Sequence, residues 1–476
     1  MTQTTQITIK PKQTGKTDIK NGFEDACVWP QILAILLSSL AGIIDGVCFA
    51  WTSPFIVKLV NDKVNYDISE AEASQLTTIQ PAFMVISCLF LFNLTDKLGR
   101  KKTLLLVGLP QTISLMIAAF ARHIYTFYLA RCFAGISSAL LWCSLPMYIG
   151  EVASPEVRGV WGNAIASSML TGQFFVNLVG SYFDVSTTSY IFLPIPILFI
   201  IFFIFMPESP YFYLMKGNEE AAKRSLMFLT RKKNVENDFI LLRNDVQRQM
   251  SESGSWRDLI SIYSNRKALI VAIFLRFSQQ FCGPSVLSQY TQFIIEKIGG
   301  AVNPQVSSML YSGSAVILNF CVVAFIIHKF KRRNLFAASI LGCCVILFVL
   351  GTYFYVDEFI PEFDLTAINW LPITAIIIYQ ICFSFGGCVI PTLMLGELFS
   401  ASIKAKAMMA LLFLFGLMLL LCNVLFNLLS SNIGPYAPFF FFASVTFVTS
   451  IFALYLIPET KGKTLEEIQM SLKEKK

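Results

Sequence analysis

The sequence predicts an all-α integral membrane protein whose twelve transmembrane helices form two pseudo-symmetric six-helix bundles. Three observations lead to this fold: apolar runs of bilayer length, a polar insert between the sixth and seventh runs, and charged motifs that recur in both halves. The composition agrees. Of the 476 residues, 55% are hydrophobic and only 14% are charged, whereas a soluble domain carries about 25% charged residues.

The apolar runs define the spans. A helix needs about 20 residues to cross a hydrocarbon core about 30 Å thick, and the runs at 32–51 and 439–457 both meet this length. The predicted spans are 31–51, 76–95, 103–122, 125–149, 161–183, 190–206, 268–296, 304–328, 334–356, 367–396, 406–430 and 437–457. The first twenty residues contain no apolar run, so we expect no cleavable signal peptide.

The basic residues predict the orientation. Of the 37 lysines and arginines, 31 lie in the terminal tails and in the segments that follow every second span. Positive charge collects on the cytoplasmic side of membrane proteins, so both termini are predicted to be cytoplasmic. The net charge of +7 follows from this bias and does not indicate a nucleic-acid partner.

The longest polar interruption gives the domain organisation. The predicted units are a cytoplasmic N-terminal tail (1–30), a six-helix bundle (31–206), a cytoplasmic helical insert (207–267), a second six-helix bundle (268–457) and a cytoplasmic C-terminal tail (458–476). Within the insert, "NEEAAKRSLMFL" (218–229) carries charges of alternating sign on one face. This pattern predicts a short amphipathic helix.

Three charged motifs have a counterpart in the second half. They are "DKLGRK" (96–101) with "HKFKRR" (328–333), "GEVASPEVR" (150–158) with "GELFSASIK" (396–404), and "PESP" (207–210) with "PETKG" (458–462). The pairs keep their order, their predicted side and a similar offset of 232, 246 and 251 residues. Such repetition indicates a duplicated six-helix unit.

Together with "QQFCG" and "PETKGKTLEEI", these motifs resemble the sugar-porter family of the major facilitator superfamily over residues 30–470. The tract "AWTSP" (50–54) with "YIGEVASPEVRG" is similar in particular to insect facilitated trehalose and hexose transporters. The resemblance implies two bundles around a central pathway that opens alternately to either side of the membrane.

The resemblance also implies an ion-pair network between the bundles on the cytoplasmic rim, which holds the outward-facing state closed from inside. Its expected members are Asp96, Arg100, Glu151, Arg158, Glu208, Arg332, Arg333, Glu397, Lys404 and Glu459. An exposed ion pair contributes only about 0–1 kcal/mol, but several together can bias an equilibrium between two states. Alternatively, these charges set the topology alone. Lysine at 404 lacks the bidentate geometry of arginine, so we expect a looser second half.

Polar residues inside the spans match the family's substrate positions. Those expected to bind substrate are Gln173, Gln279, Gln280, Ser285, Thr392 and Asn423, and those expected to form the gate are Gln289 and Tyr290. Amides and hydroxyls suit sugars because each sugar hydroxyl both donates and accepts. The alternative for each residue is a hydrogen bond between helices. Thr392 and Val424 stand where the family has tryptophans, so we expect a wider pocket that suits glucose less well.

Two ionisable residues lie deep in predicted spans, Asp45 in the first and Arg276 in the seventh. Charged groups at this depth are functional candidates. Asp45 lies one residue from the position of the aspartate in proton-coupled sugar porters, which makes proton coupling one hypothesis. The other is an Asp45–Arg276 ion pair, because the first and seventh spans are pseudo-equivalent.

The sequence therefore predicts a facilitative carrier of a hexose, trehalose or related polyol. The alternatives are a proton-coupled symporter that uses Asp45 and a sensor that binds sugar without transporting it. We expect no enzyme, cofactor or metal: the two GKT tracts lack the glycine of a nucleotide-binding loop, and the cysteines form no CxxC pattern. The expected partners are a sugar and the lipid bilayer, with the protein acting as a monomer in the plasma membrane.

Overall fold

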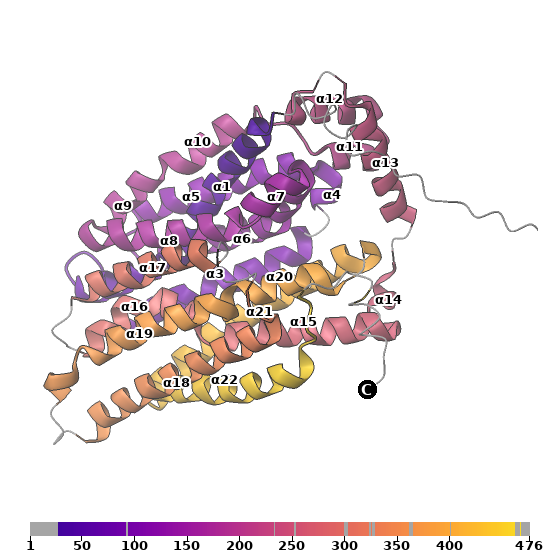
Figure 1. The fold of residues 1–476 in the computed structure, drawn as a ribbon. Coiled ribbons are helices and arrows are strands. Elements are labelled where there is room, and N and C mark those ends of the chain that lie inside the picture. Colours follow the sequence, from indigo (N-terminus) through magenta and orange to yellow (C-terminus); the bar gives the residue numbers. More distant parts are fainter. Residues whose placement is uncertain are drawn as a thin grey trace, which may run out of the picture.

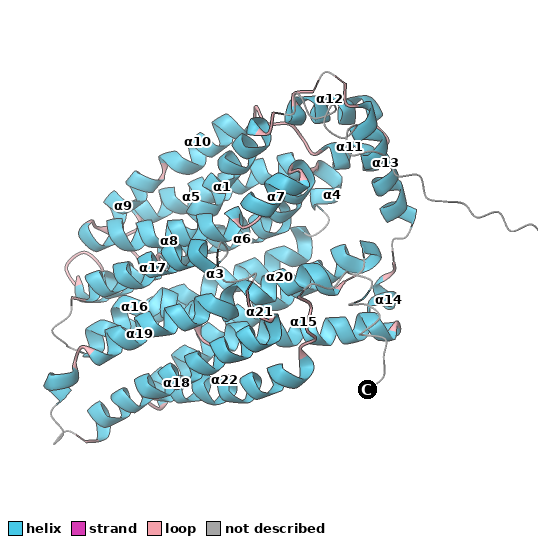
Figure 2. Ribbon diagram, viewed as in Figure 1, coloured by secondary structure: helices cyan, strands magenta, loops and turns pink. Residues whose placement is uncertain are grey.

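The computed structural model describes residues 27–91, 94–232, 234–251, 254–298, 303–322, 325, 329–360, 365–399, 401–461 and 467. Helices packed side by side make up most of this part of the chain (Figure 2). The first half consists of α1 (Trp29–Ala50), α2 (Thr52–Asn61), α3 (Glu70–Leu91), α4 (Leu94–Leu98), α5 (Arg100–Phe120), α6 (Ile124–Val152), α7 (Pro155–Trp161), α8 (Ala164–Tyr182), α9 (Val185–Phe192) and α10 (Pro194–Phe203).

Four shorter helices form the insert: α11 (Pro210–Met215), α12 (Glu219–Thr230), α13 (Glu236–Ser251) and α14 (Trp256–Ser261). The amphipathic helix predicted at 218–229 is confirmed as α12. Asn218 caps this helix, since its side chain accepts a hydrogen bond from the Ala221 backbone N–H. In Figure 1 the insert projects from one end of the helical bundles.

The second half contains α15 (Tyr263–Phe281), α16 (Pro284–Ile298), α17 (Pro304–Cys321), α18 (Arg332–Phe359), a 3₁₀ turn η3 (Leu365–Ile368), α19 (Leu371–Cys382), a π-helical segment η4 (Phe383–Cys388), α20 (Val389–Leu398), α21 (Ala401–Asn432) and α22 (Ala437–Leu456).

Ten helical segments among the described residues are long and apolar enough to cross a bilayer, and each matches a predicted span. The other two predicted spans are α8 and α17, helices of 19 and 18 residues that carry a polar face. This face includes Gln173 and Asn177 in α8 and Ser312 and Asn319 in α17, all buried. Because α8 and α17 pack against each other, their polar faces lie inside the protein rather than against lipid.

Two spans break near the predicted site. Between α15 and α16, Gly283 has a φ of 88°, a conformation that glycine adopts without strain. Backbone carbonyls left free at such a break need new partners in a membrane. Here the Gln280 carbonyl accepts from the Cys422 thiol, and the Cys282 carbonyl accepts from the Tyr379 hydroxyl at 2.9 Å. Between α19 and α20, the π-helical segment contains Gly386 and Gly387.

The helices divide into two sets that follow the sequence (Figure 1). Within the first half α1 packs on α8 and α6 packs on α3 and α5, and within the second half α18 packs on α22 and α19. The main contacts between the halves are α2 with α16, α3 with α21, and α8 with α17. The last two contacts join the second span of one half to the fifth span of the other, as expected for a pseudo-twofold relation.

The repeated motifs form equivalent helix caps. The Glu208 carboxylate accepts a hydrogen bond from the Lys101 backbone N–H at 3.0 Å, at the start of α5. In the second half, Glu459 accepts from the Arg332 and Arg333 backbone N–H groups, at the start of α18. Negative charge is favourable at a helix N-terminus. The recurrence of this cap supports the duplication predicted from the sequence.

Glycines allow α1 and α8 to approach closely. Gly42 and Gly46 form a GxxxG motif on α1, and Gly172 lies opposite on α8. A Cβ atom on Gly172 would overlap the Ile43 carbonyl oxygen, and one on Gly46 would overlap the Met169 carbonyl oxygen. Close packing of this kind replaces the hydrophobic effect as the source of helix association in lipid.

Candidate functional site

Two of the six predicted substrate residues, Gln173 and Asn423, make hydrogen bonds across the interface between the two halves. We call the end of the bundles that carries α11–α14 the insert face, and the other end the opposite face. The Gln173 side chain on α8 accepts a hydrogen bond from Ser288 on α16 at 2.9 Å, one turn beyond Ser285. The Asn423 amide on α21 donates to the Thr77 carbonyl of α3 at 3.0 Å and to Gln289 at 3.5 Å.

Several polar atoms of these residues are buried and have no partner in the described part of the chain. They are Oε1 of Gln280, Oγ of Ser285 and Oδ1 of Asn423. The three residues are 5%, 3% and 0% exposed, respectively. A buried polar atom without a hydrogen bond is costly, so it is expected to find its partner in a ligand or water. Two amide oxygens and a hydroxyl match the groups that a sugar requires.

Gln279 and Thr392 differ from the rest of the cluster. Both ends of the Gln279 amide are engaged, since Oε1 accepts from Arg276 at 2.8 Å and Nε2 donates to the Cys388 carbonyl at 3.1 Å. Thr392 is exposed on α20, and within the described residues no hydrogen bond joins it to the other five. Gln279 therefore positions Arg276 in this state.

The predicted gate residues close the opposite face. The Tyr290 hydroxyl on α16 lies 2.7 Å from Thr77 Oγ1 of α3 and donates to Asn427 Oδ1 of α21 at 2.5 Å. Gln289 also joins the halves, because its carbonyl accepts from Thr52 at 3.3 Å. These contacts tie four helices, α2, α3, α16 and α21, together across the interface between the halves.

Two further contacts lie at the rim of the opposite face. Glu70 of α3 forms a 2.6 Å ion pair with Lys297 of α16, and Asn61 of α2 donates to Glu296 of α16 at 2.8 Å. Both pairs join the first half to the second. The opposite face is therefore closed from its rim down to the polar cluster.

Replacing Tyr290 with phenylalanine removes the hydroxyl that links α3, α16 and α21, while keeping the buried ring. We expect the closed arrangement of the opposite face to lose about 1–2 kcal/mol, because one hydroxyl with several partners is removed. A cysteine placed at Gln292, buried between Ser181 and Ser308, should then react several times faster with a membrane-impermeant maleimide added from the opposite face. A labelling rate equal to that of the parent Gln292→Cys protein would contradict this role.

Toward the insert face the halves separate along α6. The last ring contact between them is Trp142 on α6 with Phe415 on α21, at 6.0 Å between centroids. Pro146, one turn further along α6, is exposed. The next turn contains Gly150, where a Cβ atom would have no neighbouring atom within 4 Å. The helices α8 and α17 stay in contact near this level, where Asn319 bonds to Ser167 at 2.9 Å. The polar cluster is thus closed toward the opposite face, whereas α6 is exposed at Pro146 toward the insert face.

On the insert face, the predicted network pairs within the first half. Arg100 is 3% exposed and lies 3.1 Å from Asp96 and 3.0 Å from Glu151. Glu151 also accepts from Ser209. Arg158 donates to the carbonyls of Gly150 and Ala153 at the end of α6.

The second half of the network is described only in part, because the Glu397 side chain lies outside the described residues. Arg332 donates to Thr460 at 3.0 Å, next to Glu459. Burial lowers the pKa of Lys404, and the charge of Arg158 in the other half lowers it further. Lys404 and Arg158, which belong to different halves, therefore lie close enough for their like charges to act on each other. Ion pairing between the halves stays a prediction for the outward-facing state.

The proposed Asp45–Arg276 ion pair is wrong for this state. Asp45 accepts hydrogen bonds from Ser138 and from the Trp142 side chain, and Arg131 is the basic residue that acts on it through its charge. The Arg276 guanidinium lies over the Phe415 ring, 5.1 Å from its centroid. The Trp142–Phe415 ring pair therefore stands between the acid of the first half and the base of the second.

The family is decided by comparison with known proteins. A family model described as "Sugar (and other) transporter" matches residues 32–472. The chain belongs to this family. Relatives named facilitated trehalose transporter Tret1 include one from Apis mellifera ligustica, 30% identical over 473 residues, covering 97% of this chain and 93% of that protein. Another, from Culex quinquefasciatus, is 29% identical over 452 residues and covers 94% and 86%. The chain spans about half the length of some others, such as 55% of the Aedes aegypti protein.

Solved structures of the proton:xylose symporter XylE share the fold. The structure bound to 6-bromo-6-deoxy-D-glucose has a TM-score of 0.73 at 20% identity and covers 94% of this chain and all of that chain. An inward open conformation of XylE from E. coli also gives 0.73, at 18% identity, covering 93% and 99%. The chain therefore has the major facilitator fold.

Sequence reasoning missed several residues of this sugar-transporter site. Trp142 contacts both Asp45 and Phe415, and Ser138 connects Asp45 to Gln80, whose amide donates to it at 3.1 Å. A tryptophan in the middle of a span was the available signal for Trp142. The buried serines carried none, because serines recur throughout the spans of this transporter.

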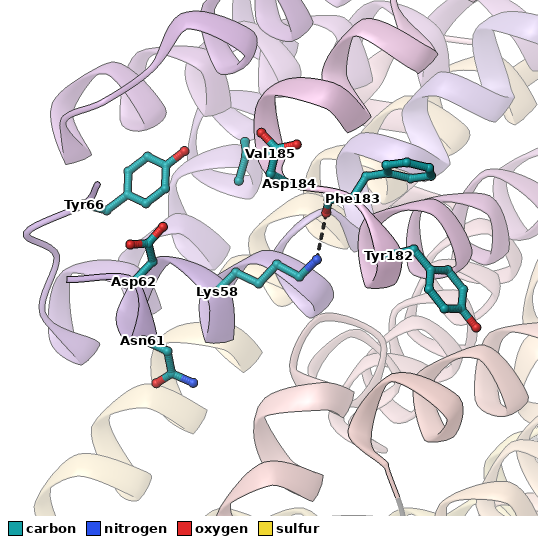
Figure 3. A pocket seen from close by; sticks show the side chains of 8 residues that line it. All are labelled: Lys58, Asn61, Asp62, Tyr66, Tyr182, Phe183, Asp184 and Val185. Atoms are coloured by element: carbon teal, nitrogen blue, oxygen red, sulfur yellow. Dashed lines mark hydrogen bonds between the residues drawn. The ribbon is translucent and has the colours of Figure 1, made fainter. Parts of the chain in front are cut away.

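A pocket lies elsewhere, at the opposite face of the transporter. It has a volume of about 410 Å³ and is lined by Lys58, Asn61, Asp62, Tyr66, Tyr182, Phe183, Asp184 and Val185 (Figure 3). The Lys58 ammonium is already engaged, because it donates to the carbonyls of Gly180 and Phe183 at the end of α8. None of the predicted site residues lines this pocket.

Proposed function

We propose that the chain carries a sugar across its membrane by alternating access, without coupling to a second solute. The observation that carries this proposal is a set of buried amide and hydroxyl oxygens on Gln280, Ser285 and Asn423 that have no partner in the described part of the chain. The family of the chain supports it, and relatives named trehalose transporters support a hexose, trehalose or related polyol as the substrate.

The surroundings of the cluster support a site for a ring-shaped ligand. Thr392 and Val424 stand where the family has tryptophans, but Trp142 brings an indole to the same interface from the first half. Aromatic faces suit the apolar faces of sugar rings. A sugar held between Trp142 and the amides of α15 and α21 would contact both halves, which is what coupling a ligand to their relative motion requires.

The orientation and location are part of this proposal. The insert face is cytoplasmic, because it carries most of the lysines and arginines. Both termini then lie in the cytoplasm, and the described state faces inward. We further propose that the protein works as a monomer in the plasma membrane, with 31–206 and 268–457 as the two moving bundles and 207–267 as a cytoplasmic insert.

Counterflow tests this function. Purified full-length protein in vesicles preloaded with unlabelled trehalose, glucose or a polyol is expected to accumulate the labelled form transiently. Gln280→Ala removes an unpartnered amide and is expected to raise the half-saturating concentration about tenfold, the loss of about 1.4 kcal/mol. Gln247→Ala, an exposed glutamine on α13, is the matched control. Saturable sugar binding without any counterflow would favour a sensor instead.

Proton symport is the second candidate, and Asp45 favours it. This carboxylate is 2% exposed and lies beside the interface of the halves. If Asp45 couples uptake to protons, a pH gradient acid on the opposite face should drive accumulation above the outside concentration, and Asp45→Asn should abolish it. Uptake that is indifferent to the gradient and to protonophores would leave Asp45 with a structural role.

A further inference from the structure

Arg276 is the residue of the site that a neutral sugar does not explain. It lies on α15, one turn before Gln279, and only partly exposed. Its Nη1 atom donates to Gln279 at 2.8 Å, and its guanidinium lies over the ring of Phe415, which contacts Trp142 of the other half. Arg276 therefore lies on the side of the second half that faces the pathway, next to the polar cluster.

The other edge of the guanidinium has no partner in the described part of the chain. Nε is buried and makes no hydrogen bond, and none is made by Nη2. This edge, with two parallel N–H groups, is the geometry that binds a carboxylate or phosphate in a bidentate manner. The guanidinium is thus oriented through Nη1, while its anion-binding edge stays free.

The charges at this depth leave Arg276 unneutralised. The first half holds Asp45 and Arg131, of opposite sign, and Arg131 acts on Asp45 through its charge. The second half holds Arg276, and no described acid lies within 4 Å of it. A buried cation without a counter-charge is costly in a membrane, and such groups mark substrate pathways or pair with another charge.

Gln279, on the same helix, holds the Arg276 guanidinium in place. In a site for a neutral sugar, Gln279 would present its amide to the ligand, but here Oε1 is bound to Arg276 and Nε2 to the Cys388 carbonyl. Gln279 therefore fixes the position of a positive charge. Gln280, Ser285 and Asn423 keep atoms free for sugar hydroxyls.

We propose that the carried sugar bears an anionic group, a carboxylate or a phosphate, which binds the Nε–Nη2 edge of Arg276 while its hydroxyls bind Gln280, Ser285 and Asn423. The inference rests on the proposed function and narrows its substrate class. Because the carrier works without a second solute, transport of such a sugar moves net charge across the membrane.

The test uses full-length wild-type protein in vesicles, with labelled glucuronate, glucose 6-phosphate, glucose and trehalose offered in parallel. We expect one anionic sugar to half-saturate uptake at a concentration at least tenfold below that of glucose. A potassium diffusion potential, positive inside, is expected to increase the accumulation of glucuronate about tenfold for each 60 mV, because one charge moves. The accumulation of glucose 6-phosphate is expected to rise more steeply, because a phosphate monoester carries close to two charges. Comparison of glucuronate with glucose 6-phosphate tells whether the anion is a carboxylate or a phosphate.

Variants assign the effect to this side chain. Arg276→Gln is expected to reduce the preference for the anionic sugar over glucose at least tenfold. Arg276→Lys keeps the charge but loses the two parallel N–H groups, so it is expected to reduce the preference less. Arg122→Gln, which removes an exposed arginine of the opposite face, is the control and should keep the preference. The wild-type measurements decide even if a variant fails to fold.

The outcomes separate the two proposals. Uptake of glucose and trehalose without uptake of either anionic sugar overturns the role of Arg276 and leaves the carrier of neutral sugars standing. Anionic uptake that Arg276→Gln leaves unchanged also overturns it. Failure to carry any of the four sugars counts against the proposed function itself.

Discussion

Gly172→Ala is expected to destabilise the first half by about 3 kcal/mol or more, although it adds a single methyl group. The new Cβ would overlap the Ile43 carbonyl oxygen and lie 2.9 Å from the Val47 backbone nitrogen on α1. These are backbone atoms of a helix, so they cannot turn aside as a side chain can. Overpacking of interiors commonly costs about 1–3 kcal/mol, and more when no rotamer relieves it. The loss of stability is measured by heating the purified protein and using size-exclusion chromatography to monitor how much folded protein remains.

A matched control is available in the same half. Gly150 lies inside α6 with nothing within 4 Å of a built Cβ. Alanine is favoured over glycine in a helix by about 1 kcal/mol, so Gly150→Ala is expected to keep or slightly raise the unfolding temperature. Equal behaviour of the two variants would show that α1 and α8 are not packed through their glycines.

Glu151→Ala is expected to lower the unfolding free energy by about 3 kcal/mol and to stall turnover. The side chains of Arg100 and Glu151 are 3% and 15% exposed, so the pair is shielded from water. Removing one partner of a buried pair costs about 3–5 kcal/mol, because the other charge stays buried. Asp96 remains 3.1 Å from Arg100 and limits the loss to the lower end of this range. Thermal unfolding and initial uptake rates in vesicles measure the two effects.

Glu236→Ala is the control for this substitution. Glu236 pairs with Lys223 on the insert at 2.9 Å, but the two side chains are 53% and 35% exposed. Such pairs contribute about 0–1 kcal/mol, so little change is expected. Normal turnover in Glu151→Ala would contradict a role of the network in the transport cycle. Normal turnover with lowered stability would assign the Arg100–Glu151 pair to the first half alone.

The spans were the most predictable part of the fold, because lipid demands long apolar helices wherever the chain crosses it. The errors lie at their ends. The helix α3 begins at Glu70 rather than 76, and α15 at Tyr263 rather than 268, because polar first turns outside the lipid continue the helices. The sequence also placed α8 and α17 correctly, although their polar faces make them less apolar than the other spans.

The sequence could name candidate site residues through the family motifs, but it could not predict the partners of their side chains. Gln173 and Asn423 bond across the interface between the halves, and the binding role of these two residues, Gln280 and Ser285 stays a prediction. Which charges pair depends on helix rotation and on the state of the transporter, neither of which is encoded locally. For that reason the Asp45–Arg276 pair failed and the role of Trp142 went unnoticed.

The polar faces of α8 and α17 have a consequence for biosynthesis. A segment with buried serines, glutamines and asparagines partitions weakly from the translocon into lipid, and each of these two finds its cover in the opposite half of the molecule. If the second half is expressed by itself, α8 is missing and the polar face of α17 is exposed to lipid. Each half expressed alone is therefore expected to insert poorly into the membrane. Co-expression of the two halves as separate chains is expected to restore insertion.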